Sequence, residues 1–165
     1  MCKRMMQQRA DIEAVLNKDL ERCLEGILKT GRVSIPRVRV DLDELYIANR
    51  EYFEHEGFIF EAATRIEKNQ IKYYAWLRLG GEGTLANQYW KKIKLAEADF
   101  VNHQRQKISD QLRETGGGYY YIEDISGFRF ENKLYFEERG YFFEPVTINK
   151  NGTALNGAHM RKRKR

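Results

Sequence analysis

The strongest constraint in the sequence is a helical pattern of apolar residues that runs from Thr84 to about Thr115. Apolar side chains recur every third or fourth residue along this stretch, and the threonine at its start is a good helix N-cap. A run of glycines, 116–118, ends the pattern. At 1.5 Å per residue such a helix is about 46 Å long, which is more than the core of one small domain covers. We therefore expect it to kink or to project, and we expect this helix or the first one to form a homo-oligomer, most simply a dimer.

Two further helices are expected before the long one. Apolar residues at helical spacing lie between Asp11, a suitable N-cap, and Gly31, a suitable residue for a helix end. Cys23 lies on this apolar stripe, so we expect it to behave as a small buried hydrophobic residue. The second helix should run from about Leu42 to Glu56.

Alternating apolar residues predict strands on either side of that second helix. Residues 33–42 form one strand-like run, with a change of phase at Pro36. Residues 58–67 and 71–79 form a hairpin that turns at residues 68–70. After the long helix, short strand-like runs occupy residues 119–122, 128–130, 134–136 and 141–148. The expected fold is α+β, with about three helices, the third of them long, packed on an antiparallel sheet made by the central hairpin and the C-terminal strands.

The length of 165 residues suits one domain, and we assign residues 1–148 to a single α+β domain. Residues 149–165 are rich in Asn, Gly, Lys and Arg and have little to bury, so we expect a disordered basic tail there. No internal repeat is evident. No apolar run approaches the roughly 20 residues that cross a membrane, and no signal peptide is recognisable. We therefore expect a cytoplasmic protein with no membrane partner, and the basic tail leaves a nuclear location open.

The positive charge is confined to a few segments. Residues 161–165 are all Lys or Arg, so they account for the whole formal net charge of +5. A second basic stretch, 29–40, contains no acidic residue, and alternate arginines on it share one strand face. Because phosphates attract clustered bases, we expect a small non-catalytic accessory protein that binds DNA or RNA. The residues expected to bind nucleic acid are Arg32, Arg37, Arg39, Lys91, Lys92, Lys94, Arg161, Lys162, Arg163, Lys164 and Arg165.

The acidic and aromatic segments favour a different function. Residues 41–61 are strongly acidic, and aromatic residues are concentrated in 119–143, where acidic neighbours would repel a phosphate backbone. Tyr and Phe are common in protein interfaces, so the alternative function is a protein-binding regulator or inhibitor. The residues expected to bind a protein partner are Glu51, Glu54, Tyr120, Tyr135 and Phe142.

Catalytic and metal-binding patterns are weak in this sequence. Asp41, Asp43 and Glu61 could converge on Mg²⁺, but the acid–x–lysine pair typical of a metal-dependent nuclease is missing. Glu51 and His55 have helical spacing but lack a third ligand. We therefore expect no catalytic residue, metal or cofactor, and a metal-dependent nuclease is a distant alternative.

Overall fold

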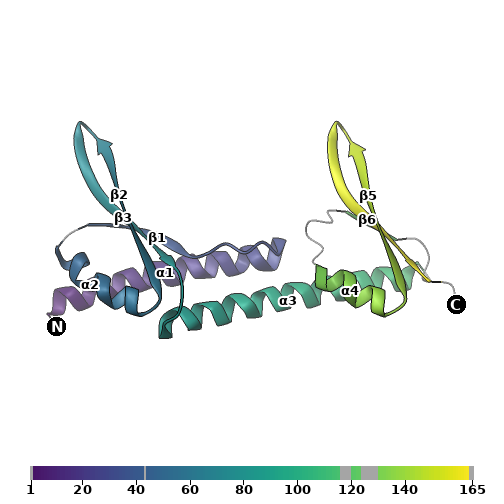
Figure 1. Cartoon of the computed structure of the whole chain (residues 1–165), viewed down its shortest axis with the longest axis horizontal. Coiled ribbons are helices and arrows are strands. Elements are labelled where there is room, and N and C mark those ends of the chain that lie inside the picture. Colours follow the sequence, from purple (N-terminus) through teal and green to yellow (C-terminus); the bar gives the residue numbers. More distant parts are fainter. Residues whose placement is uncertain (1, 43, 116–119, 124–129, 164–165) are drawn as a thin grey trace. The chain divides into compact units, whose positions relative to one another are not determined.

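The computed structural model describes residues 2–42, 44–115, 120–123 and 130–163, and within these ranges it has four helices and two small antiparallel sheets (Figure 1). The elements are α1 (Lys3–Thr30), β1 (Arg37–Asp41), α2 (Glu44–His55), β2 (Phe58–Glu67), β3 (Gln70–Leu79), α3 (Thr84–Glu114), β4 (Tyr120–Glu123), α4 (Phe130–Glu138), β5 (Tyr141–Lys150) and β6 (Thr153–Lys162). The α+β class, the long third helix and the central hairpin are therefore confirmed.

The chain divides into two compact units instead of the single domain expected for residues 1–148. The first unit comprises Met1–Lys29 and Val33–Glu97, and the second comprises Thr30–Arg32 and Ala98–Arg165. The division falls within α3, so one continuous helix contributes its first half to one unit and its second half to the other.

The first unit has a sheet of strand order β1-β3-β2 with helices packed against one face. Its core includes Leu16 and Ile27 of α1, Phe53 of α2, Leu77 of β3 and Ile93 of α3. In the second half of β3 every second residue is buried (Ala75, Leu77 and Leu79), which is the pattern of a strand with one face against the core. The opposite face of the same sheet carries polar and aromatic side chains.

Gly57 lies in the turn between α2 and β2, at a position where no other residue fits. Its φ of 94° is one that side-chain-bearing residues rarely adopt. A Cβ atom at this position would also lie 2.4 Å from the Cβ of Ala86 at the start of α3. The turn can therefore lie against α3 only because residue 57 is glycine.

The second unit has a sheet of strand order β4-β6-β5, the helix α4 and the second half of α3. Its core is smaller and consists of Ile108, Leu112, Phe136 and Met160. In Figure 1 the hairpin of each unit extends beyond the helices of that unit.

Two expectations for the C-terminal third are corrected by this unit. Residues 130–138 form α4 in place of the short strands expected at 128–130 and 134–136; residues 124–129 lie outside the described part. The helix buries Asn132 and Phe136, four residues apart and so on one helical face. Residues 149–162, expected to be disordered, form the end of β5 and the strand β6. A turn with positive φ at Asn151 (52°) and Gly152 (77°) reverses the chain, and backbone pairing along β5 then orders a strand of polar composition.

Two boundaries near the N-terminus also differ from the expectation. The first helix begins at Lys3, before the N-cap expected at Asp11. The strand β1 begins only at Arg37, so Val33 and Ile35 lie outside it, and each is 43% exposed. Among the described residues, no helix is both long and apolar enough to cross a membrane.

Candidate functional site

The exposed face of the first sheet combines arginines with aromatic rings. We call the side chains of Arg37, Arg39, Glu61, Tyr74, Trp76 and Arg78 the first open face. The strand register brings them together, because Arg37 pairs with Arg78 across the β1–β3 ladder and Arg39 pairs with Trp76. Glu61 pairs with Trp76 from the other side. Side chains of directly paired residues lie on the same face of a sheet, so all six point away from the core.

Two guanidinium groups of the first open face lie over aromatic rings. The Cζ atom of Arg37 is 4.3 Å from the ring centroid of Trp76, and that of Arg39 is 5.6 Å from the ring centroid of Tyr74. The two rings meet edge to face, with centroids 6.4 Å apart and an interplanar angle of 81°. These distances are typical of cation–π contacts, which restrict the arginines without neutralising their charge.

Glu61, the acidic residue that β2 contributes to the first open face, is paired. Arg78 donates from Nε to Oε1 of Glu61 at 2.7 Å. The two side chains are 36% and 51% exposed, so the pair contributes little to stability but removes the repulsion that Glu61 would exert on an anion. At the β1 edge the charges of Arg37 and Arg39 stand beside exposed Asp41 of the same strand face. Both arginines also line a groove with Glu21 and Glu25 of α1.

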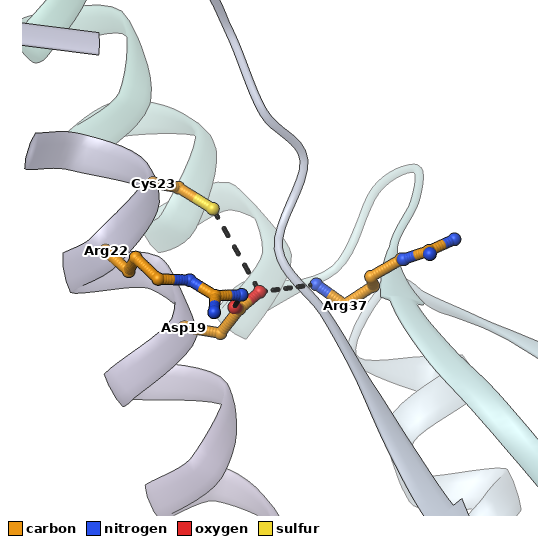
Figure 2. Close-up of polar contacts among 4 residues, drawn as sticks. All are labelled: Asp19, Arg22, Cys23 and Arg37. Atoms are coloured by element: carbon orange, nitrogen blue, oxygen red, sulfur yellow. Dashed lines mark hydrogen bonds and ion pairs between the residues drawn. The ribbon is translucent and has the colours of Figure 1, made fainter. Parts of the chain in front are cut away.

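Asp19 of α1 fixes the start of β1 and with it the position of Arg37 (Figure 2). Its carboxylate accepts a hydrogen bond from the backbone N–H of Arg37 at 2.8 Å and another from the guanidinium of Arg22. The side chain of Asp19 is only 9% exposed, which strengthens both interactions. The first arginine of β1 is thus tied to the helix that forms the core of the unit.

Cys23 lies beside this carboxylate and behaves as the sequence pattern indicates. Its Sγ atom is 4.0 Å from Oδ2 of Asp19 (Figure 2), and its side chain is 5% exposed. Burial raises the pKa of the Cys23 thiol. A protonated, buried thiol is a poor nucleophile, so Cys23 contributes packing.

The other basic residues predicted to bind nucleic acid are distributed over the chain. Lys91, Lys92 and Lys94 are exposed on α3, and Lys91 and Lys94 line one shallow groove with Trp90. This groove is separate from the first open face, because α3 packs on the core side of the sheet. Arg32 is exposed between α1 and β1.

Two of the five basic C-terminal residues lie in a strand and not in a tail. Arg161 and Lys162 end β6, and the backbone N–H of Arg163 donates to the carbonyl of Gly140 at 2.7 Å. Lys164 and Arg165 lie outside the described residues. The Cζ atom of Arg161 lies 4.8 Å from the ring centroid of Phe142, and that of Arg163 lies 4.7 Å from it.

The residues predicted to bind a protein partner belong to several elements. Glu51 is exposed on α2, and Glu54 pairs with Arg50 at 2.7 Å. Tyr135 of α4 packs on the second core between two arginines, and Phe142 of β5 is 39% exposed. Tyr120 lies in β4, where only the backbone is described.

The acidic residues considered for a metal site do not gather in the described part of the chain. Asp41 and Glu61 lie on β1 and β2, which are separated by β3, and Asp43 is outside the described residues. No group of three or more His, Cys, Asp or Glu with metal-binding geometry occurs among the residues that were described.

Sequence reasoning missed three members of the first open face, namely Tyr74, Trp76 and Arg78. The apolar alternation in residues 71–79 identifies the buried face of β3, and the intervening residues necessarily form the other face. That signal was sufficient to place these side chains with one another. Their pairing with Arg37 and Arg39 depends on the β1–β3 register, which local sequence does not specify.

Comparison with known proteins does not assign this arrangement to a family. No protein-family model matches the chain, and no curated protein or solved structure is significantly similar to it.

Proposed function

We propose that the protein is a small nucleic-acid-binding accessory protein and that the first open face is its binding surface. The supporting observation is the pair of guanidiniums held over rings on an uncovered sheet face, Arg37 over Trp76 and Arg39 over Tyr74. Arginines that are already restricted lose less freedom when they bind an anion. Arginine also matches the geometry of a phosphate group with two parallel donors.

The rings give the surface a second kind of contact. A base that displaces a guanidinium from Trp76 or Tyr74 can stack on the exposed ring, and such stacking is worth about 1–3 kcal/mol per base. The displaced guanidinium then remains close enough to hold the adjacent phosphate. This combination of rings and bases suits single-stranded nucleic acid, while a duplex would use the arginines alone.

Other basic groups extend the same function. Lys91 and Lys94 on α3 and Arg161 and Arg163 in the second unit add positive charge outside the first open face. The proposed place of action is the cytoplasm, or the nucleus if the protein enters it, because both hold DNA or RNA.

The test is fluorescence anisotropy of the full chain with labelled single-stranded DNA, duplex DNA and single-stranded RNA at several salt concentrations. The double variant Arg37→Gln/Arg39→Gln should bind about tenfold more weakly. It should also reduce the slope of log affinity against log salt by roughly 1.4 to 1.8, since each lost phosphate contact removes about 0.7 to 0.9. The variant Trp76→Ala should weaken binding to single strands more than binding to duplex.

A charge-matched control is available at the start of α1. Lys3→Gln/Arg4→Gln removes the same charge from exposed positions away from the sheet and should change affinity less than twofold. Equal losses in both double variants would show nonspecific attraction and exclude the first open face as the site. Absence of binding by the wild-type chain to all three probes would reject the function itself.

A protein-binding regulator is the second candidate, and one observation favours it. The end of the β2–β3 hairpin exposes Ile66, Ile71 and Tyr73, which are 80%, 62% and 60% exposed. Apolar groups gathered at the end of a projecting hairpin are typical of protein contacts, including contacts between two copies of one chain. A chain that self-associates without binding nucleic acid, and loses association in Ile71→Lys, would support this candidate instead.

A further inference from the structure

The two units have the same order of elements and the same sheet. The first contains α1, β1, α2, β2 and β3, with strand order β1-β3-β2. The second contains the end of α3, β4, α4, β5 and β6, with strand order β4-β6-β5. In each unit the last two strands form a hairpin, and the first strand pairs with the last. This is one αβαββ topology used twice.

The sequence repeats along with the topology. Residues 49–61 are NREYFEHEGFIFE and residues 132–144 are NKLYFEERGYFFE. With the same spacing, residues 75–78 are AWLR and residues 158–161 are AHMR. On the helices, residues 8–16 are QRADIEAVL and residues 104–112 are QRQKISDQL. The repeat is difficult to see in the sequence because the shared residues are scattered.

A buried asparagine has the same contacts in both units. Asn49 and Asn132 are each 0% exposed. The Oδ1 atom of Asn49 accepts from Nε of Arg9 at 3.3 Å, and that of Asn132 accepts from Nε of Arg105 at 2.7 Å. In both cases Nδ2 donates to the glutamine that precedes this arginine in the sequence. A buried amide needs such partners, so the three residues form one cluster that is present twice.

The aromatic packing around these clusters is also duplicated. The rings of Tyr52 and Phe53 are 5.1 Å apart at 78°, and those of Tyr135 and Phe136 are 5.1 Å apart at 84°. The arginine of each cluster lies over the tyrosine of its own unit, at 3.7 Å from the Tyr52 centroid and 4.4 Å from the Tyr135 centroid. A shared topology alone does not dictate side-chain geometry of this kind.

The turns agree as well. Gly57 and Gly140 have φ values of 94° and 90°, and each N–H donates at 3.1 Å to the carbonyl three residues before it. Each hairpin turns on two consecutive residues with positive φ, Lys68 and Asn69 in the first and Asn151 and Gly152 in the second.

The repeat defines a second open face, made by Phe142, Glu144, His159, Arg161 and the adjoining Arg163. Its strand residues occupy the same strand positions in the second unit as Ile59, Glu61, Trp76 and Arg78 occupy in the first. On it Arg161 pairs with Glu144 at 3.1 Å, as Arg78 pairs with Glu61 in the first unit. The ring of Phe142 lies under the guanidiniums of Arg161 and Arg163. His159 and Gly157 occupy the positions that Trp76 and Tyr74 have in the first unit. The central strand of the second sheet therefore lacks the Trp and Tyr rings of the first, and Phe142 of β5 supplies an aromatic ring instead.

We propose that the chain is a tandem duplicate of one αβαββ module and that the open face of the second copy is a second binding surface for the phosphate backbone of nucleic acid. Arg163 provides the charge, Arg161 neutralises Glu144, and Phe142 holds both guanidiniums in place. Arg161 thereby acts from β6, and Arg163 acts from just beyond the end of that strand. This part of the proposal rests on the function proposed above, whereas the duplication stands on the contacts alone.

The duplication is tested by hydrogen–deuterium exchange on the full chain. Asn49→Leu should increase exchange in α2 and β2 and leave α4 and β5 unchanged, and Asn132→Leu should do the reverse. The milder pair Gln8→Ala and Gln104→Ala serves if an asparagine variant fails to fold, and it should show the same two patterns with smaller increases. If only one variant of a pair increases exchange in its own unit and its counterpart changes nothing, the equivalence of the two clusters is overturned.

The second face is tested by anisotropy with the same three nucleic-acid probes. Arg161→Gln/Arg163→Gln should weaken binding about fivefold and lower the salt slope, and Phe142→Ala should weaken it about twofold. Lys107→Gln/Arg113→Gln, which removes equal charge from exposed positions of α3, should have little effect.

Different results would reject the proposed function and the second binding face. If Arg37→Gln/Arg39→Gln weakens binding and Arg161→Gln/Arg163→Gln does not, the second face is rejected and the proposed function stands. If the wild-type chain binds none of the probes, both are rejected. A fall in affinity with both double variants supports two binding faces.

Discussion

The two units use the same module but complete it differently. In the first unit Phe58 and Leu79 are buried, at 3% and 1% exposure, in a core that α3 completes with Tyr89 and Ile93. The matching positions of the second unit are Tyr141 and Lys162, which are more exposed. Amphipathic Tyr141 and charged Lys162 therefore replace apolar residues at the paired ends of β5 and β6. The difference indicates that the shared residues maintain the module, while the differing ones suit what each copy contacts.

The largest expected difference concerns the shared phenylalanine. Phe53 and Phe136 have 0% and 2% exposure and the same edge-to-face tyrosine neighbour. Phe53→Ala should reduce the free energy of unfolding of the first unit by about 4 kcal/mol, because a large cavity forms in an extensive core. Phe136→Ala should reduce that of the second unit by about 3 kcal/mol, because a smaller core collapses more easily.

These two losses can be measured separately. Both tryptophans, Trp76 and Trp90, belong to the first unit, so tryptophan fluorescence in a urea titration follows that unit alone. Hydrogen exchange of α4 and β5 amides follows the second. Equal destabilisation of both units by either variant would mean that they unfold together, and the comparison would then hold for structure but not for stability.

A smaller effect is expected at alkaline pH and concerns the first unit. Burial, and to a lesser extent the charge of Glu13, raises the pKa of Tyr89 to about 12. The Tyr89 hydroxyl donates to Oδ1 of Asn17 at 2.6 Å. Between about pH 10 and 12 the unfolded state loses this proton before the folded state does. Stability that is fully present below pH 10 is therefore lost as the pH rises toward 12, by up to about 2 kcal/mol.

Urea titrations at pH 8 and pH 11, followed by tryptophan fluorescence, measure this loss. Tyr89→Phe should reduce the difference between the two pH values, although it lowers stability at pH 8 by removing the hydrogen bond. Tyr73→Phe, at a position that is 60% exposed, provides the control and should leave the difference unchanged. If Tyr89→Phe leaves the alkaline loss intact, another group is responsible for it.

The smallest of these effects separates two helical ion pairs with the same spacing. Asp19 pairs with Arg22 in the first unit and Asp110 pairs with Arg113 in the second, but the carboxylate side chains are 9% and 52% exposed. Asp19→Ala should cost the first unit about 1.5 kcal/mol, because the N–H of Arg37 loses a charged acceptor. Asp110→Ala should cost about 0.5 kcal/mol or less, as is usual for a surface pair.

Thermal unfolding by circular dichroism, combined with hydrogen exchange at β1, measures both changes. Asp19→Ala should also weaken nucleic-acid binding, since the carboxylate holds the strand that carries Arg37 and Arg39. A result in which the two variants are equally mild would show that Asp19 does not anchor β1.

Much of the fold is local and could be predicted. The helical spacing of apolar residues and the glycines at either end identify α3, and alternation with a polar turn identifies the β2–β3 hairpin. Two of the six side chains of the first open face were predicted in the same way, since Arg37 and Arg39 alternate on one strand. Residues 134–136 were assigned wrongly because a short apolar run suits a buried strand and a helix face equally well.

The sequence by itself determined the α+β class, the long helix, the central hairpin and the arginines of β1. Each depends on periodicity, or on glycines at turns, within one short segment. The tertiary structure alone decided that the polar C-terminal residues form β6, that rings of β3 lie beneath arginines of β1, and that two modules share one set of buried contacts. These features depend on pairing between segments far apart in the chain, and backbone hydrogen bonds and buried amides stabilise such pairing without leaving a local pattern.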